Sequence, residues 1–162
     1  YDKSLTFNKR IIMAELRQFV GFMLAQEHYG IDIMAVEEII RMVEITPVPR
    51  APGFVEGIIN MRGRVIPIVD LRKKLNVRVS ANSEATRIIV VCIQSRRIGL
   101  IVDKVEEVIR IEVDKIDKAP GTSPTIDNYI SGVARTPKCM VIILDILKVF
   151  SIQEQMALDS LS

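Results

Sequence analysis

The chain of 162 residues has no tryptophan, one histidine and two cysteines, and only 5% of its residues are aromatic. A single histidine, His28, and two distant cysteines, Cys92 and Cys139, do not supply the ligands of an ordinary zinc site. A serine or cysteine nucleophile would also need His28 as its base. We instead expect His28 to be an exposed turn residue, because it lies in the polar stretch from Gln26 to Gly30. We therefore expect no catalytic residue, no metal and no cofactor.

Long hydrophobic runs are also absent. The longest, such as residues 88–93, have about six apolar residues, whereas a membrane-spanning helix needs about 20. Residues 1–10 lack the apolar segment of a signal peptide, so we expect residues 1–17 to form a polar tail and the protein to be cytoplasmic. Both cysteines lie in apolar runs, which favours buried reduced thiols over a disulfide. The glycine-rich loops that hold nucleotide phosphates do not occur either.

What the chain does have is apolar residues, at 49%, and nearly balanced charges that leave a net charge of +2. This composition excludes a disordered protein, which combines low hydrophobicity with high net charge. Folding of a chain this long buries roughly two-thirds of the unfolded surface, which is enough for a core without disulfides. The chain is therefore one domain or two very small ones.

The sequence contains an internal duplication. Residues 19–42 match residues 88–111 at a constant offset of 69. The identical pairs are Gly30/Gly99, Val36/Val105, Glu37/Glu106, Glu38/Glu107, Ile40/Ile109 and Arg41/Arg110. A later stretch matches at an offset of 75, which places Gly57 on Gly132 and Asp70 on Asp145. We predict two units, at about 18–78 and 86–152, that share a core or exchange elements, followed by a C-terminal helix over 153–162.

The secondary structure expected is mainly β. Short β-branched runs separated by glycine and proline predict small antiparallel barrels, and strands that are apolar on both faces are expected if two such barrels pack together. In each unit the strands at 18–24 and 86–93 are followed by a polar stretch that ends at Gly30 or Gly99. This pattern predicts hairpins whose loops have four or five residues and contain these glycines as turn residues.

Three further residues are expected to shape turns or helix ends. Gly63 suits a tight hairpin turn that needs a positive φ. Asp70 and Asp145 are each followed by a short helical pattern, so both are predicted N-caps. Their equivalent positions also allow a paired-carboxylate hydrolase, but the sequences that follow them favour the caps.

Several basic residues cluster loosely in the sequence. The cluster consists of Arg62, Arg64, Arg72, Lys73, Lys74 and Arg78. One alternative function is therefore a small basic barrel that binds nucleic acid. No aromatic residue that could stack on bases lies between Phe54 and Tyr129. A solvated charged face is the favoured interpretation. Arg62, at a hairpin tip, either points outward or binds a carboxylate, for which Glu38 is the candidate.

Three segments carry a resemblance to a known family. They are residues 27–39, 51–75 and 99–111, and the second contains F-V-x-G-x-x-N-x-R-G-x-x-x-P-I-V-D-L. The chain resembles the CheW family of bacterial chemotaxis coupling proteins from Gln18 to about Ser162. The same fold occurs in the regulatory domain of the histidine kinase CheA and in CheV. Because nothing resembles a kinase or receiver domain, a stand-alone coupling protein is the best match.

The resemblance implies a fold of two small five-stranded barrels packed side by side. It also implies a non-enzymatic scaffold that binds the CheA regulatory domain and the cytoplasmic tips of methyl-accepting chemoreceptors. It implies no nucleic acid, no membrane insertion, and recruitment to membrane-associated receptor arrays. Receptor contact maps to Val36, Glu38, Ile39, Arg62, Ile88, Val105 and Val108. Kinase contact maps to Gly57, Val65 and Ile66. The chain departs from the family pattern at Arg64, where many relatives have an apolar residue.

Overall fold

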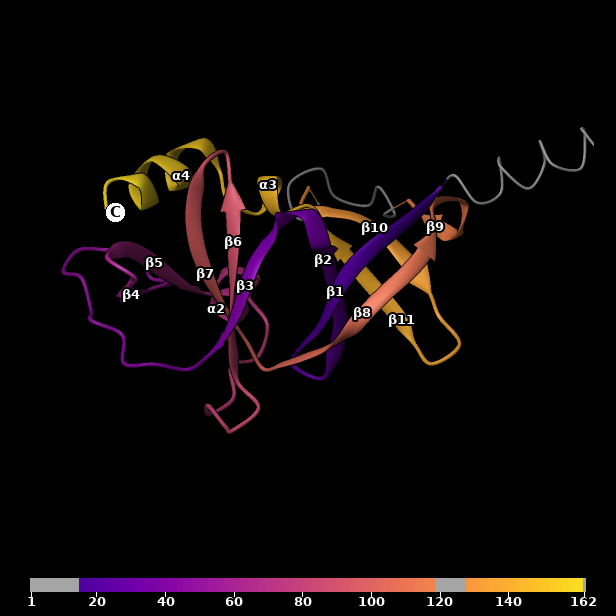
Figure 1. Cartoon of the computed structure of the whole chain (residues 1–162), viewed down its shortest axis with the longest axis horizontal. Coiled ribbons are helices and arrows are strands. Elements are labelled where there is room, and N and C mark those ends of the chain that lie inside the picture. The colour runs from indigo at the N-terminus through magenta and orange to yellow at the C-terminus, as the bar shows by residue number, and fades with distance from the viewer. Residues whose placement is uncertain (1–14, 119–127, 162) are drawn as a thin grey trace, which may run out of the picture.

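The computed structural model describes residues 15–118 and 128–161, which fold mainly into strands (Figure 1). The predicted tail, residues 1–17, lies mostly outside the described residues. The mainly β class is confirmed, but the strands form two open sheets and not closed five-stranded barrels. Closure would require the two edge strands of a sheet to pair, and within the described residues they do not.

The larger sheet has six strands in the order β8-β1-β2-β11-β10-β9. They are β1 (Leu16–Leu24), β2 (Glu27–Asp32), β8 (Lys104–Glu112), β9 (Ile116–Asp117), β10 (Ile130–Arg135) and β11 (Met140–Leu144). A 3-10 turn, η2 (Val113–Lys115), joins β8 to β9. All neighbours are antiparallel except β2 and β11, which are parallel.

The smaller sheet has five strands in the order β3-β6-β7-β5-β4. They are β3 (Val36–Arg41), β4 (Val55–Met61), β5 (Arg64–Asp70), β6 (Arg87–Ile93) and β7 (Arg96–Val102). Here β5 and β7 are the parallel pair. Residues 43–48 leave the sheet and return only through Thr46, which pairs with Ile58 of β4. Pro47 in this segment and Pro49 directly after it lack the N–H that a continuous ladder needs.

Strands are exchanged between the two halves of the sequence. The β1–β2 hairpin lies in the sheet built by β8 to β11, and the β6–β7 hairpin lies in the sheet built by β3 to β5. The chain crosses between sheets through η1 (Ile33–Ala35) and again at Asp103, between β7 and β8. Each sheet is thus completed by a hairpin that belongs, in sequence, to the other copy.

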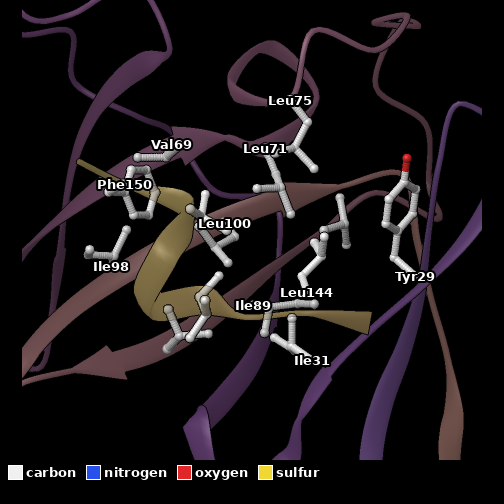
Figure 2. Close-up of a cluster of buried hydrophobic side chains, with 14 of the residues drawn as sticks. Tyr29, Ile31, Val69, Leu71, Leu75, Ile89, Ile98, Leu100, Leu144 and Phe150 are labelled. Atoms are coloured by element: carbon white, nitrogen blue, oxygen red, sulfur yellow. The ribbon is translucent and has the colours of Figure 1, made fainter. Parts of the chain in front are cut away.

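The largest hydrophobic cluster is shared by both sheets (Figure 2). Tyr29, Ile31 and Leu144 enter it from the six-stranded sheet, and Ile89 and Leu100 enter it from the five-stranded sheet. Two smaller clusters lie around Ile66 and around Phe19, one in each sheet. The common core fixes how the sheets pack, because burial of apolar surface is the main favourable term in folding.

The hairpins that begin each repeat turn through two residues and not four or five. Ala25 and Gln26 have φ of 50° and 70°, and Gln94 and Ser95 have φ of 49° and 70°. Two positive φ values in succession define the tight turn whose twist suits a hairpin. Gly30 and Gly99 therefore lie inside β2 and β7, away from the turns.

Three short helices follow β5 and β11. They are α2 (Leu71–Lys74), α3 (Ile146–Val149) and α4 (Ile152–Asp159). Asp70 accepts a hydrogen bond from the Arg72 N–H at the start of α2, and Asp145 accepts one from the Leu147 N–H at the start of α3. α4 lies beside the turn between β6 and β7 (Figure 1). No helix within the described ranges is long and apolar enough to cross a membrane.

Candidate functional site

An ion pair joins β3 to the tip of the β4–β5 hairpin. Arg62 Nη2 donates to Glu38 Oε1 at 2.8 Å and to Oε2 at 3.0 Å. Arg62 and Gly63 form the tip with φ of 53° and 81°, and the Gly63 N–H donates to Asn60 Oδ1 at 3.0 Å. The tight turn aims Arg62 back towards Glu38, although 72% of the arginine side chain stays exposed. Of the two orientations open to Arg62, the structure shows the one that binds Glu38.

A second pair lies directly beside the first. β3 has a bulge between Val36 and Glu38, and the bulged residue Glu37 accepts from Arg97 Nε at 2.9 Å. The two glutamates thus bind one arginine from the β4–β5 turn and one from β7. Together they line a hollow of about 360 Å³. Its lining residues are Glu37, Glu38, Met61, Arg62, Arg64 and Arg97.

The same arrangement recurs in the six-stranded sheet. Glu106, equivalent to Glu37, binds His28 Nδ1 at 2.7 Å. His28 lies in β2, at the position equivalent to Arg97, so it is not the turn residue that we expected. Glu107, equivalent to Glu38, binds Lys138 Nζ at 3.3 Å. Sequence inspection missed both pairs, although the offset of 69 already places Glu106 on Glu37 and His28 on Arg97.

Exposed apolar side chains flank each set of ion pairs. Ile39 and Val65 are both 40% exposed in the five-stranded sheet. Their equivalents in the six-stranded sheet, Val108 and Met140, are 49% and 57% exposed. Exposed apolar side chains next to charged pairs are typical of protein-contact surfaces, which have an apolar centre and a polar rim.

The predicted receptor-contact residues have different environments. Glu38, Ile39, Arg62 and Val108 reach the surface. Val36 and Val105 are half-buried and pack against the shared core near the points where the chain crosses between sheets. Ile88 has no exposed surface and belongs to the cluster around Ile66. Direct contact by the Ile88 side chain therefore does not fit this conformation.

Of the predicted kinase-contact residues, only Val65 is exposed. Ile66 is fully buried, so its side chain supports β5 from beneath. Gly57 is buried with φ of +148°, and a Cβ there would meet the carbonyl oxygen of Thr46. The glycine is needed for this close approach of residues 43–48 to β4. Of these three residues, only Val65 has an exposed side chain.

Arg72 is buried, which corrects the expectation that the basic cluster forms a solvated face. Its Nε donates to Asp70 Oδ1 at 2.9 Å, and its Nη1 donates to Asp103 Oδ1 at 2.7 Å. The hydrogen bond to Asp70, followed by that to Asp103, raises the pKa of Arg72 despite its burial. The other oxygen of Asp103 accepts from the Ala25 N–H at 2.8 Å. The network therefore ties α2 to the β1–β2 turn, across the two sheets.

The paired-carboxylate hydrolase considered from the sequence does not fit the positions of Asp70 and Asp145. Both carboxylate oxygens of Asp70 bind Arg72, and Asp145 caps a different helix, so the two aspartates do not form a shared acid site.

Cys92 is exposed and Cys139 is half-buried, so the expectation of two buried thiols was wrong. Over residues 15–118 and 128–161 no cluster of side chains is placed to hold a metal ion.

Comparison with known proteins identifies the family. The family model described as the CheW-like domain matches residues 18–154. The chain belongs to the CheW family. The chemotaxis protein CheW of Treponema pallidum is 35% identical over 169 residues, with 99% of both chains covered. That of Helicobacter pylori is 34% identical and covers 80% of this chain and 79% of its own.

A solved structure agrees with the assignment. The scaffolding protein CheW from Thermoanaerobacter tengcongensis superposes with a TM-score of 0.79 at 39% identity, covering 85% of this chain and 94% of its own. The CheW family consists of non-catalytic chemotaxis adaptors, and the observed site, made of ion pairs beside exposed aliphatic side chains, is suited to binding proteins.

Proposed function

We propose that the chain is a non-enzymatic scaffold that couples chemoreceptors to the histidine kinase CheA. The observation that carries this proposal is the exposed Glu38–Arg62 pair next to the exposed Ile39. It brings a pair of charges together with an apolar side chain, because Arg62 at the β4–β5 tip reaches Glu38, which lies next to Ile39 on the edge strand β3. Membership of the CheW family supplies the partners, and recruitment to receptor arrays follows from binding them.

The receptor surface runs over β3 and β8. A receptor tip is expected to be an amphipathic helical hairpin, and such helices dock by laying their apolar face on exposed aliphatic side chains. Ile39 on β3 and Val108 on β8 provide these side chains, and the glutamates beside them provide the polar rim. Contacts of this kind are reversible, and dissociation constants on the order of micromolar are suitable for regulation.

The kinase surface is centred on Val65. It is the one predicted kinase-contact residue whose side chain is open to a partner. It lies on β5, on the hairpin that also carries Arg62, so receptor and kinase would bind close to each other. This proximity allows a change at one contact to alter the other through the hairpin.

The nucleic-acid alternative is disfavoured by how the basic cluster is used. Arg72 is buried, Lys73 binds Glu56 at 2.9 Å, and Lys74 lies 3.5 Å from Glu154. Arg62 binds Glu38. Affinity for nucleic acid depends on cations that are free to neutralise phosphates. Four of the six basic residues are already neutralised by carboxylates.

The test is binding of the full chain to a receptor-tip peptide hairpin and to the CheA regulatory domain. We expect both to bind, and we expect Arg62→Glu to weaken receptor binding by about tenfold or more. The double variant Glu38→Arg with Arg62→Glu keeps an ion pair but exchanges the positions of its two charges. It therefore distinguishes an effect of losing the pair from an effect of its orientation. Arg78→Glu, at an exposed arginine outside the site, is the matched control.

Each outcome has one meaning. If the wild-type chain bound neither partner, the proposed function would be wrong. If Arg62→Glu lost its NMR amide dispersion, Arg62 would be a structural residue and the assigned receptor surface would be wrong. Steeply salt-dependent binding to DNA or RNA would instead support the nucleic-acid alternative.

A further inference from the structure

Two hollows meet at Arg64, the first residue of β5. The hollow that contains the Glu38–Arg62 pair has Arg64 in its lining. A second hollow, also of about 360 Å³, shares Arg64 and Arg97 with the first. It is lined by Arg64, Val65, Ile66, Ser95, Arg96, Arg97 and Asp159. Arg64 and Arg97 therefore border both hollows, whose lining residues come from elements between β3 and α4.

The charges around these hollows do not balance. Arg62 binds Glu38, Arg97 binds Glu37 at 2.8 Å, and Arg96 Nε lies 3.1 Å from Asp159. Arg64 is exposed and has no carboxylate within ion-pair distance in the part of the chain that the structure describes. Its positive charge is the one in excess, since the three carboxylates that line the hollows are already bound.

The hairpin does not need this charge in order to fold. In the other repeat the equivalent of Arg64 is the neutral Cys139. Each tip is closed by its own side chain–backbone bonds, from the Gly63 N–H to Asn60 Oδ1 at 3.0 Å and from the Cys139 N–H to Thr136 Oγ1 at 3.1 Å. Folding of the turn therefore gives no reason for a cation at position 64.

The surroundings of Arg64 define what it can bind. Guanidinium groups bind carboxylates through two parallel hydrogen bonds, and this geometry adds specificity as well as energy. Each hollow also contains an aliphatic side chain among its charged residues, Met61 in one and the exposed Val65 in the other. A single free cation beside these aliphatic side chains suits an acidic side chain with an apolar neighbour. It does not suit a polyphosphate, which needs several free cations.

We propose that Arg64 determines the specificity of kinase docking by binding a carboxylate of an acidic–apolar segment on the kinase, whose apolar residue packs on Val65. This inference rests on the proposed kinase contact at Val65. It adds the chemical identity of the partner surface, which membership of a family does not fix. A kinase whose docking segment has a neutral or basic residue at this point would bind this chain poorly.

The test measures binding of the full chain to the CheA regulatory domain by calorimetry at low and high salt. Loss of one partner of a buried charge pair at an interface is expensive. We therefore expect affinity to fall about tenfold for Arg64→Ala and about a hundredfold for Arg64→Glu. The control Arg78→Glu reverses an equally exposed charge outside both hollows and should bind as wild type does. Substitution to lysine of the matching kinase carboxylate should restore binding to Arg64→Glu.

The outcomes separate this inference from the function on which it rests. Wild-type binding with unchanged affinity in Arg64→Glu would overturn the role of Arg64 and leave the proposed function intact. Absence of wild-type binding would overturn both. Binding of DNA or inorganic phosphate that is lost in Arg64→Ala would show that the site is a general anion site and would overturn the inference. Circular dichroism of each variant verifies that it is folded.

Discussion

Arg97 and His28 occupy equivalent positions in the two repeats, and each binds the glutamate at a bulge of the edge strand that lies two strands away in its sheet. Arg97 donates to Glu37 at 2.9 Å, and His28 lies 2.7 Å from Glu106. Both bulges interrupt the ladder beside a second glutamate that binds the opposite hairpin tip. The duplication has therefore preserved the placement of these contacts while changing the residues that meet the glutamates.

The His28–Glu106 contact is expected to couple the two residues energetically. Partly exposed ion pairs contribute about 0.2–1 kcal/mol. In urea denaturation, His28→Ala and Glu106→Ala should each lower the free energy of unfolding by about this amount, and the double variant should cost less than their sum. His28→Arg copies the other repeat and should unfold within about 0.5 kcal/mol of wild type. Strict additivity of the two alanine substitutions would show that the pair contributes nothing.

Much of the fold could be predicted from the sequence because the duplication marks the strands twice. The offset of 75 placed the N-caps Asp70 and Asp145 at the ends of equivalent strands. The turns at Ala25–Gln26 and Gln94–Ser95 could not be found, since neither contains the asparagine or glycine that usually signals two positive φ values. The sequence also did not predict which strands are exchanged between the sheets. A hydrophobic pattern shows which face of a strand is buried, but it does not identify the strand with which it pairs.

The candidate site could be predicted only in part, for a related reason. Glu38 and Arg62 were found because an unusual tip sequence made Arg62 stand out. Arg72 lies in a run of basic residues that is typical of a solvated surface, and only the folded chain brings Asp103 to it. Burial of Ile66 and Ile88 was missed as well, since an alternating strand has two faces and the pattern does not show which face a partner will meet.

Arg72 is expected to be essential for stability. Removal of one member of a buried ion pair leaves an uncompensated charge and costs about 3–5 kcal/mol. Arg72→Ala leaves both Asp70 and Asp103 without their cation, so its urea midpoint should fall strongly. Arg72→Lys should also be destabilised, because a lysine cannot bind both carboxylates in the geometry of the guanidinium.

Two further variants complete that experiment. Asp103→Asn keeps the shape of the side chain and should cost less than Arg72→Ala, so it reports on the network even if Arg72→Ala does not fold. Arg78→Ala is the matched control at an exposed arginine and should stay within about 0.5 kcal/mol of wild type. A wild-type midpoint for Arg72→Ala would mean that the network is not important for stability.

Tyr29 should make the stability of the chain depend on pH in the alkaline range. Burial, followed by the charge of Glu27, raises the pKa of Tyr29 above its ordinary value of 10.0. The folded state therefore binds this proton more tightly than the unfolded state does. Its contribution is complete below pH 10.0 and is lost as the pH rises through the folded pKa. Tyr29→Phe should therefore lose less free energy of unfolding than wild type as the pH rises through the alkaline range. Urea denaturation from neutral to alkaline pH measures this difference. Identical pH profiles for the two proteins would contradict the prediction.

Gly99 should be intolerant of alanine because methyl groups of two isoleucines lie close to it. A Cβ at Gly99 would lie 2.5 Å from Ile68 Cδ1 and 2.8 Å from Ile88 Cγ2. Overpacking of a well-packed core costs about 1–3 kcal/mol, so Gly99→Ala should unfold more easily by that amount. Ile68→Val removes the Cδ1 atom and should recover part of the loss when it is combined with Gly99→Ala, although alone it costs about 0.5–1.5 kcal/mol. The double variant should therefore lose less free energy of unfolding than the sum of the losses in the two single variants. Gly53 is a suitable control, because a Cβ there would meet no atom within 4 Å, and Gly53→Ala should leave stability nearly unchanged.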